Sequence, residues 1–185
     1  MKEMVESEQL IMDGDVIYLP PFYYAEIGTA NKLKNLMGST SMKAVPVQPN
    51  IQAISLQTGI EYDDVQVDAI RQAVNSKVMV LTGGPGTGKT TTTQGIIAAL
   101  KDMGLKILLA APTGRAAKRM SEATGMEAKT IHRLLEYNPA DGYKRNDENP
   151  IEGDVLIVDE CSMIDILLMN NLVKALSESM RLILV

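Results

Sequence analysis

The hydrophobic positions of this chain follow two periods, which predict two kinds of element. Nearly continuous apolar runs, typical of buried parallel strands, occur at residues 78–81, 106–111, 154–159 and 181–185. Apolar residues spaced three or four apart predict helices at residues 51–59, 63–74, 88–103, 114–123, 130–137 and 164–179. Strands and helices alternate, so the predicted fold class is α/β, with one parallel sheet and helices on both faces. Such sheets bind ligands at the carboxyl ends of their strands.

The first 49 residues follow a different pattern. Residues 9–19 hold two short apolar runs around an Asp-Gly pair, which is a strong hairpin signal, and two prolines end the second run. Residues 23–37 have apolar positions at helical spacing, and a glycine follows them. A polar segment with two prolines comes next. We therefore predict a small hairpin and helix appendage with a linker over residues 1–49, and a main domain over residues 50–185.

A glycine-rich loop joins the first predicted strand of the sheet to the helix after it. Gly83, four intervening residues and Gly88-Lys89-Thr90 match the P-loop pattern, whose glycines let consecutive N–H groups converge on phosphate oxygens. Lys89 adds a full positive charge, the helix N-terminus adds a partial one, and the Thr90 hydroxyl is a ligand for Mg²⁺. The pattern predicts a P-loop NTPase that binds ATP and Mg²⁺. The expected cofactor-binding residues of the loop are Gly83, Gly84, Pro85, Gly86, Thr87, Gly88, Lys89, Thr90 and Thr91.

Two acidic residues, Asp159 and Glu160, stand at the carboxyl end of the third apolar run. A carboxylate at this edge can hold the Mg²⁺ that Thr90 also binds, and its neighbour can deprotonate a water against the γ-phosphate. We therefore predict Lys89, Thr90, Asp159 and Glu160 as catalytic residues, with Thr90 and Asp159 as metal ligands. The alternative is that the acidic pair only caps the next helix.

Composition limits the class of protein. Among 185 residues, 45% are hydrophobic, which is enough for a core. The net charge of −5 excludes a uniformly basic surface for nucleic acid but leaves room for a local basic stripe. The one cysteine, Cys161, excludes an internal disulfide framework, and we assign it a packing role. The acidic N-terminus and the lack of an apolar stretch of about 18 residues favour a cytoplasmic protein without a membrane partner.

The phosphate loop and the acidic pair belong to a set of four motifs that occur in order along the chain. The motifs are residues 83–90, 111–118, 130–134 and 159–163. Together they resemble the superfamily one DNA helicases of the RecD/TraA type, which are related to the exonuclease V alpha subunit. The resemblance implies that residues 50–185 form the first RecA-like motor domain, truncated at its C-terminus, of an ATP-dependent helicase that moves 5′ to 3′ in DNA recombination or repair. Residues 1–49 resemble, more weakly, the end of the domain that precedes this motor.

The resemblance also assigns roles to single residues. Gln66 matches the family's adenine-contacting glutamine, since an amide can pair with two adenine atoms; the alternative is a solvated helix glutamine. The segments that touch single-stranded DNA in the family match Pro112, Thr113, Arg115, Thr130 and His132. Basic side chains gather around these segments, which suits contacts with phosphates that are independent of base sequence. For Lys118, Arg119 and Lys129, an ordinary charged helix face is the alternative.

Partners follow from the same resemblance: single-stranded DNA, a second motor domain of the same polypeptide, and nuclease subunits. Without the second domain, the chain alone is expected to lack helicase activity. Residues 138–146 match the place of a small hairpin that acts at the DNA fork in the family, with a plain surface loop as the alternative. The run at residues 181–185 is expected to form an exposed edge that promotes self-association. A P-loop phosphotransferase and a non-catalytic nucleotide-binding interaction module stay open as other functions.

Overall fold

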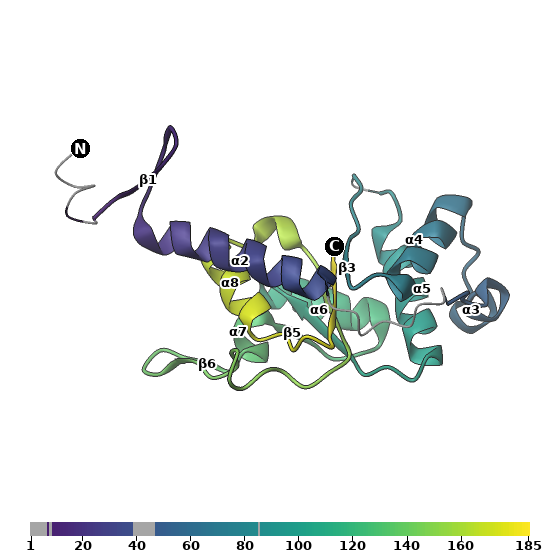
Figure 1. The fold of residues 1–185 in the computed structure, drawn as a ribbon. Coiled ribbons are helices and arrows are strands. Elements are labelled where there is room, and N and C mark those ends of the chain that lie inside the picture. The colour runs from purple at the N-terminus through teal and green to yellow at the C-terminus, as the bar shows by residue number, and fades with distance from the viewer. Residues whose placement is uncertain (1–6, 8, 39–46, 85) are drawn as a thin grey trace.

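A parallel five-stranded sheet forms the centre of the computed structural model, which describes residues 7, 9–38, 47–84 and 86–185 (Figure 1). The strand order is β3-β9-β8-β4-β5, and every neighbouring pair is parallel. These strands are β3 (Val78–Val80), β4 (Ile107–Ala111), β5 (Ala128–Thr130), β8 (Val155–Val158) and β9 (Arg181–Leu184). Each of the four apolar runs therefore forms a strand of the sheet, as predicted.

Helices cover both faces of the sheet because side chains alternate along each strand. In β8, Val155 and Ile157 belong to one buried cluster, and Leu156 and Val158 belong to the other. The first cluster includes residues of α3 (Ile51–Thr58), α4 (Asp64–Asn75), α5 (Lys89–Asp102) and α6 (Gly114–Thr124). The second cluster includes residues of α2 (Pro20–Gly38), α7 (Ile131–Leu134) and α8 (Ile166–Lys174). The predicted α/β fold of a P-loop NTPase is therefore confirmed.

Side-chain caps start two helices where the sequence predicts them. Asn50 Oδ1 accepts a hydrogen bond from Ala53 N–H at 3.1 Å, at the start of α3. Asp63 and Gln66 form a reciprocal capping box at the start of α4: Asp63 Oδ1 accepts from Gln66 N–H at 2.8 Å, and Gln66 Oε1 accepts from Asp63 N–H at 3.1 Å. Such caps satisfy amides that have no partner within their helix.

Two helices are shorter than predicted, and one strand was not predicted. The segment at residues 130–137 is helical only in α7, and the segment at residues 164–179 is helical only in α8. Before α7, the chain forms β5 and pairs with β4, with Thr130 opposite Ala111. The β5 sequence is Ala-Lys-Thr, which has no apolar run, so its strand conformation depends on pairing with β4 rather than on a local pattern.

The position of β9 corrects the expectation of self-association through an exposed terminal strand. β9 lies between β3 and β8, and Leu182 lies opposite both Val78 and Leu156. Leu182 and Ile183 are 0% and 1% exposed. The strand therefore has hydrogen-bonding partners on both sides, and the strands at the ends of the sheet order are β3 and β5.

The predicted N-terminal hairpin is present. β1 (Ile11–Asp13) and β2 (Val16–Tyr18) pair antiparallel around Gly14, which has a φ of 58°. The following helix begins at Pro20, earlier than predicted, because proline is favoured in the first turn of a helix. A second hairpin overlaps residues 138–146, for which a hairpin or a plain loop was expected, and it begins one residue earlier, in the segment predicted to be helical. It consists of β6 (Tyr137–Asn138) and β7 (Gly142–Tyr143).

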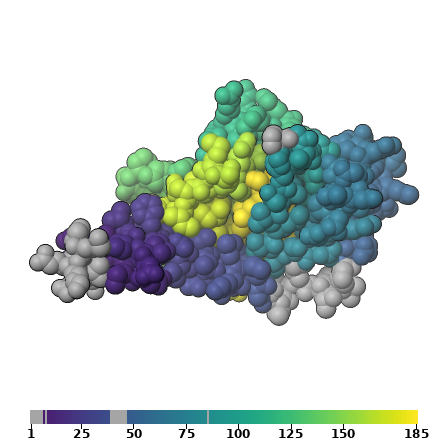
Figure 2. Space-filling view, turned by 90° about the horizontal axis from the view of Figure 1, so that it is seen from above, coloured from purple at the N-terminus to yellow at the C-terminus, as the bar shows by residue number. Residues whose placement is uncertain are grey.

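The helix α2 packs on the main domain along α8 (Figures 1 and 2). Leu36 is 1% exposed in the cluster that it shares with residues of α8. Gly28 permits this close approach, because a Cβ there would lie 2.6 Å from Oδ1 of Asn170. Neither α2 nor any other helix of the described residues has the length and apolar character needed to cross a bilayer. Residues 39–46 of the predicted linker lie outside the described residues, and the domain boundary near residue 50 stays a prediction.

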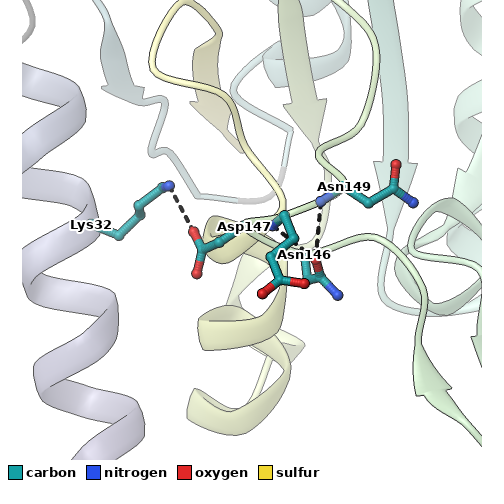
Figure 3. A network of polar contacts seen from close by, with 5 residues as sticks. Lys32, Asn146, Asp147 and Asn149 are labelled. Atoms are coloured by element: carbon teal, nitrogen blue, oxygen red, sulfur yellow. Dashed lines mark hydrogen bonds and ion pairs between the residues drawn. The ribbon is translucent and has the colours of Figure 1, made fainter.

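The loop after the second hairpin also contacts α2 (Figure 3). Asn146 Oδ1 accepts hydrogen bonds from the N–H groups of Glu148 at 3.0 Å and Asn149 at 3.1 Å. Asp147, in the same turn, forms an ion pair with Lys32 of α2 at 3.0 Å. The appendage and the main domain are therefore joined by this polar contact as well as by the apolar contact with α8.

Lys77 is a buried charge at the amino end of β3. Its ammonium is hydrogen-bonded by the segment between α8 and β9: Nζ donates to the carbonyl oxygens of Glu178 and Ser179, at 2.8 Å each, and of Met180 at 3.4 Å. Burial lowers the pKa of the Lys77 ammonium, and the nearby charge of Arg181 lowers it further. These carbonyl oxygens offset the loss of hydration that burial causes.

Candidate nucleotide-binding site

The carboxyl ends of the strands bring the predicted site residues to one edge of the sheet. β3 leads into the glycine-rich loop, β8 into Asp159, β4 into Pro112, and β5 ends at Thr130. Thr130 lies opposite Ala111, so the two segments predicted to contact DNA are neighbours. The strand order therefore places the phosphate loop at one end of this edge, the acidic pair in the middle, and these two segments at the other end.

The glycine-rich loop has the backbone that a phosphate cradle requires. Gly86 and Gly88 have φ values of 77° and 78°, a region that L side chains disfavour. A Cβ on Gly83 would lie 2.5 Å from Oγ1 of Thr87, and a Cβ on Gly88 would lie 2.7 Å from Nε2 of Gln66. Glycine at these positions keeps the loop tight and its inner surface lined by backbone groups.

The Lys89 ammonium lies inside the loop. Its Nζ donates to the carbonyl oxygens of Gly83 at 2.5 Å and Gly84 at 3.2 Å. Thr87 Oγ1 also donates to Gly84 O, at 2.8 Å. Lys89 is therefore placed where it can exchange these carbonyls for the oxygens of a phosphate. Pro85, which was also predicted to bind the nucleotide, lies outside the described residues.

The threonines at the start of α5 have different environments. Thr92 and Thr93 are 4% and 6% exposed, and their hydroxyls donate to main-chain carbonyls one turn earlier, at 3.0 and 2.9 Å. Thr90 is exposed and lines the cleft beside the loop. The helix ladder begins with Thr92 N–H and Gly88 O, so the amides of residues 89–91 precede the first bond within the helix. These amides and the Thr90 hydroxyl are therefore the groups of this turn that suit a phosphate and its metal.

Gln66 is held against the end of the phosphate loop. Its Oε1 belongs to the capping box with Asp63, and its Nε2 faces Gly88. Gln66 is half-buried, so a fully solvated glutamine does not describe it. Its contact with adenine stays a prediction; Oε1 has a second lone pair besides the one that accepts from Asp63 N–H, and Nε2 can donate.

The backbone of the sheet fixes the acidic pair. Asp159 N–H donates to Ala110 O at 2.9 Å, and Glu160 N–H donates to Asp159 Oδ1 at 2.9 Å. Glu160 has a φ of 56°, a strained conformation for a residue with a Cβ, and such strain concentrates at functional sites. The pair does not cap α8, because Asp165 does so by accepting from Leu168 N–H at 2.8 Å.

An open cleft of about 700 Å³ contains all four predicted catalytic residues. They are Lys89, Thr90, Asp159 and Glu160. Hydroxyl and carboxylate oxygens are the hard ligands that Mg²⁺ prefers, and this ion keeps several waters of its own. The donor set of Thr90 and Asp159 in one cleft therefore fits a magnesium ion bound together with phosphates.

Arg119 is a residue of the cleft that the sequence grouped with the basic side chains near DNA. Its Nη2 lies 2.9 Å from Oε1 of Glu160, and both residues line the cleft. Lys118, the residue before Arg119, pairs instead with Glu122 at 3.8 Å. Lys118 and Arg119 are three and four residues from Arg115, so their spacing does not separate them and only the contacts of the structure do.

Cys161 directly follows the acidic pair and packs against the apolar cluster that contains residues of α8. Burial raises the pKa of its thiol to about 11, and Sγ donates to Val158 O at 3.1 Å. Its N–H donates to Val185 O at 2.9 Å, which joins the end of β8 to the end of β9. A thiol that stays protonated is a poor nucleophile, so the geometry agrees with a packing role.

The threonines predicted to contact DNA also cap helices. Thr113 Oγ1 accepts from Ala116 N–H at the start of α6, and Thr130 Oγ1 accepts from Arg133 N–H at the start of α7, both at 3.2 Å. Pro112 is half-buried beside Thr113. The hydroxyls therefore have structural roles, and their contact with DNA stays a prediction.

His132, predicted to lie on DNA, belongs to an aromatic cluster that includes the second hairpin. Its ring centroid lies 5.5 Å from that of Tyr137 and 6.0 Å from that of Tyr143, and the two tyrosine centroids are 4.8 Å apart. The tyrosines meet only because β6 pairs with β7, so sequence reasoning missed the cluster. Arg115, on α6, is exposed at the same edge of the sheet.

Comparison with known proteins agrees with this arrangement. A family model described as an AAA domain matches residues 66–185, which extend from the capping glutamine of α4 to the end of the chain. The chain belongs to this AAA-domain family. The match covers the phosphate loop, the acidic pair and the whole five-stranded sheet of this family member.

Relatives confirm the resemblance to RecD-type helicases. The ATP-dependent RecD2 DNA helicase of Deinococcus radiodurans is 37% identical over 169 residues, which are 91% of this chain and 23% of the relative. The RecBCD enzyme subunit RecD of Mycolicibacterium smegmatis is 33% identical over 93% of this chain and 34% of its own length. The chain therefore spans between 23% and 34% of these two relatives. The crystal structure of the Pif1 helicase from Candida albicans aligns with a TM-score of 0.49 and 25% identity, over 68% of this chain and 32% of that one.

Proposed function

We propose that this chain is the ATP-binding motor domain of a RecD-type, ATP-dependent DNA helicase that acts in DNA recombination or repair. The observation that carries the proposal is the order of groups along one sheet edge: phosphate loop, acidic pair, then two adjacent segments with exposed basic side chains. Relatives described as RecD and RecD2 helicases, at 33% and 37% identity, support it.

Each group of residues in the cleft has a separate role in ATP hydrolysis. The amides at the start of α5 and the Lys89 ammonium bind the phosphates and stabilise charge on the transferred group. A bound Mg²⁺, held by Thr90 and Asp159, would neutralise charge on the β- and γ-phosphates. Glu160 orients a water and accepts its proton as the water attacks the γ-phosphate. Gln66, next to Gly88, is placed to contact the adenine.

The other end of the edge contacts a single strand of DNA. The predicted DNA contacts lie at the ends of two neighbouring β-strands: Pro112, Thr113 and Arg115 after β4, and Thr130 and His132 at the end of β5. The single strand of DNA therefore crosses the carboxyl ends of β4 and β5. Contacts of this kind are made mainly to phosphates and give affinity without base preference. Movement from 5′ to 3′ is the direction that the RecD resemblance implies.

We propose a second motor domain of the same polypeptide as the first partner of this domain, because an arginine reaching the phosphates from another domain is worth about 10³–10⁵ in rate in related hydrolases. Nuclease subunits are proposed as further partners and the cytoplasm as the location. The second hairpin is proposed to act at the DNA fork.

Binding of a fluorescent ATP analogue with Mg²⁺, measured by anisotropy, tests the proposal. The chain and its Lys89→Ala variant are titrated with and without an oligothymidylate. We expect binding that is lost in Lys89→Ala and altered by the DNA. Lys101→Ala is the matched control, since it removes a lysine charge from the exposed last turn of the same helix, α5.

Two results would contradict it. Binding that is indifferent to Lys89 would show that the loop does not hold the phosphates. Binding that needs Lys89 but ignores DNA would favour a phosphotransferase or a nucleotide-binding interaction module, which have no strand site to couple.

A further inference from the structure

The contact between Arg119 and Glu160 is not explained by folding alone. The side chains are 63% and 36% exposed, and an ion pair with this exposure adds little to stability because water screens it. The distance of 2.9 Å nevertheless fixes the carboxylate proposed as the base of the reaction. Its effect therefore concerns where that carboxylate points.

Only the side chain of Glu160 has freedom to move. Its backbone is held in the left-handed region by the bond from its own N–H to Asp159 Oδ1, and the next residue is tied to Val185 O. The side-chain torsions decide whether the carboxylate faces the cleft. Arg119 donates a hydrogen bond to Oε1 of Glu160 and not to its second carboxylate oxygen, Oε2.

Arg119 reaches Glu160 from the helix that begins at the proposed DNA segment. Thr113 caps α6, and Arg119 follows six residues later, which is about 9 Å along the axis at 1.5 Å per residue. Ala116 and Ala117 are 1% and 5% exposed and hold the first turns against the sheet. A displacement at the cap is therefore carried to Arg119, because a short helix packed in this way moves as a unit.

We propose that Arg119 is a positioning residue that sets the Glu160 carboxylate and couples the strand segment at the start of α6 to the nucleotide cleft. The inference rests on the proposed function, since it requires both sites. It predicts that Arg119 acts through Glu160 and is not itself a phosphate ligand. Replacing Arg119 or Glu160 then uncouples the DNA segment from the nucleotide cleft, while the phosphate loop continues to bind nucleotide.

The test uses this chain and measures the affinity for a fluorescent Mg–ATP analogue with and without saturating oligothymidylate. In the wild type, DNA changes this affinity by about fivefold or more, as expected for two coupled sites. Arg119→Gln and Glu160→Gln each bring the ratio to about one, and the affinity of Arg119→Gln without DNA changes by about twofold or less. The double variant behaves like either single one, because both remove the same link.

Two further variants make the result specific. Arg71→Gln removes an arginine from the exposed face of α4 and keeps the wild-type ratio. Arg119→Lys keeps a positive charge but lacks the planar guanidinium, so we expect a DNA effect on nucleotide affinity that is between those of Arg119→Gln and the wild type. Thermal unfolding of each variant by circular dichroism shows that the fold is retained.

The outcomes separate this inference from the proposed function. Wild-type coupling that survives Arg119→Gln overturns the inference alone. A loss of nucleotide affinity in Arg119→Gln as large as that in Lys89→Ala also overturns it, because Arg119 would then bind phosphate directly. Absence of a DNA effect in the wild type overturns both the inference and the proposed strand site.

Discussion

Replacing Gly95 with alanine tests how closely α4 packs on α5. Gly95 lies in the buried middle of α5. A Cβ at this position would lie 2.6 Å from Cδ1 of Ile70 and 2.9 Å from two ring carbons of Tyr62. Ile70 is 0% exposed, and the Tyr62 hydroxyl donates to Thr58 at 3.0 Å, so neither neighbour is free to withdraw.

Two opposing effects set the magnitude. Alanine favours a helix over glycine by about 1 kcal/mol, whereas overpacking a buried contact costs about 1–3 kcal/mol. The contacts below 3.0 Å involve a buried methyl group and an aromatic ring, so the cost lies toward the upper end. We expect Gly95→Ala to lose about 2 kcal/mol of unfolding free energy, or about 4–8 °C in melting temperature for a chain of this length.

Urea unfolding followed by circular dichroism measures this change. Gly114→Ala is the matched control, because Gly114 begins α6 and a Cβ there would meet nothing within 4 Å. Ile70→Val removes the Cδ1 atom, so combining it with Gly95→Ala should cost about 1 kcal/mol less than the sum of the two single changes. A Gly95→Ala variant more stable than the wild type would refute the close packing of the two helices.

Three other predictions follow from polar and titratable groups. Lys77→Met should lower the unfolding free energy by about 2–4 kcal/mol in urea, because three carbonyl oxygens lose a buried donor; an unchanged midpoint would show that they find other partners. The Cys161 pKa is raised from 9.0 to about 11, so the folded state holds its proton more tightly, and this stabilisation is complete below about pH 9 and falls as pH rises toward about 11. Alkylation by iodoacetamide at pH 8 should therefore be about 100-fold slower in the folded chain than in urea, and equal rates would contradict the burial. Asp147→Asn breaks an ion pair with Lys32 in which the carboxylate side chain is 58% exposed, and it should change stability by less than about 1 kcal/mol, whereas a larger loss in thermal unfolding would mean that this contact holds α2 in place.

Much of the fold and of the nucleotide site could be predicted from the sequence because the signals are local. The four runs form strands of a parallel sheet with helices on both faces, in which most strand positions are apolar. Asn50 and Asp63 cap helices because their short side chains reach backbone amides three residues on. The glycines, Lys89 and Thr90 of the loop all lie within residues 83–90, so their spacing already predicts a phosphate cradle.

Only the tertiary structure decided which distant segments become neighbours. Periodicity indicates that a strand is buried but not which strands flank it, so the central place of β9 and the pairing of β5 with β4 were not visible in the sequence. The bond between Arg119 and Glu160 joins residues 41 positions apart, and it exists because α6 and the end of β8 meet at the same edge. The sequence does not distinguish the consecutive threonines of α5, and only the structure shows that Thr92 and Thr93 are buried and bond to their own helix, whereas Thr90 is exposed. Local chemistry therefore determined the elements and the phosphate loop, whereas contacts across the sheet decided how the remaining side chains are used.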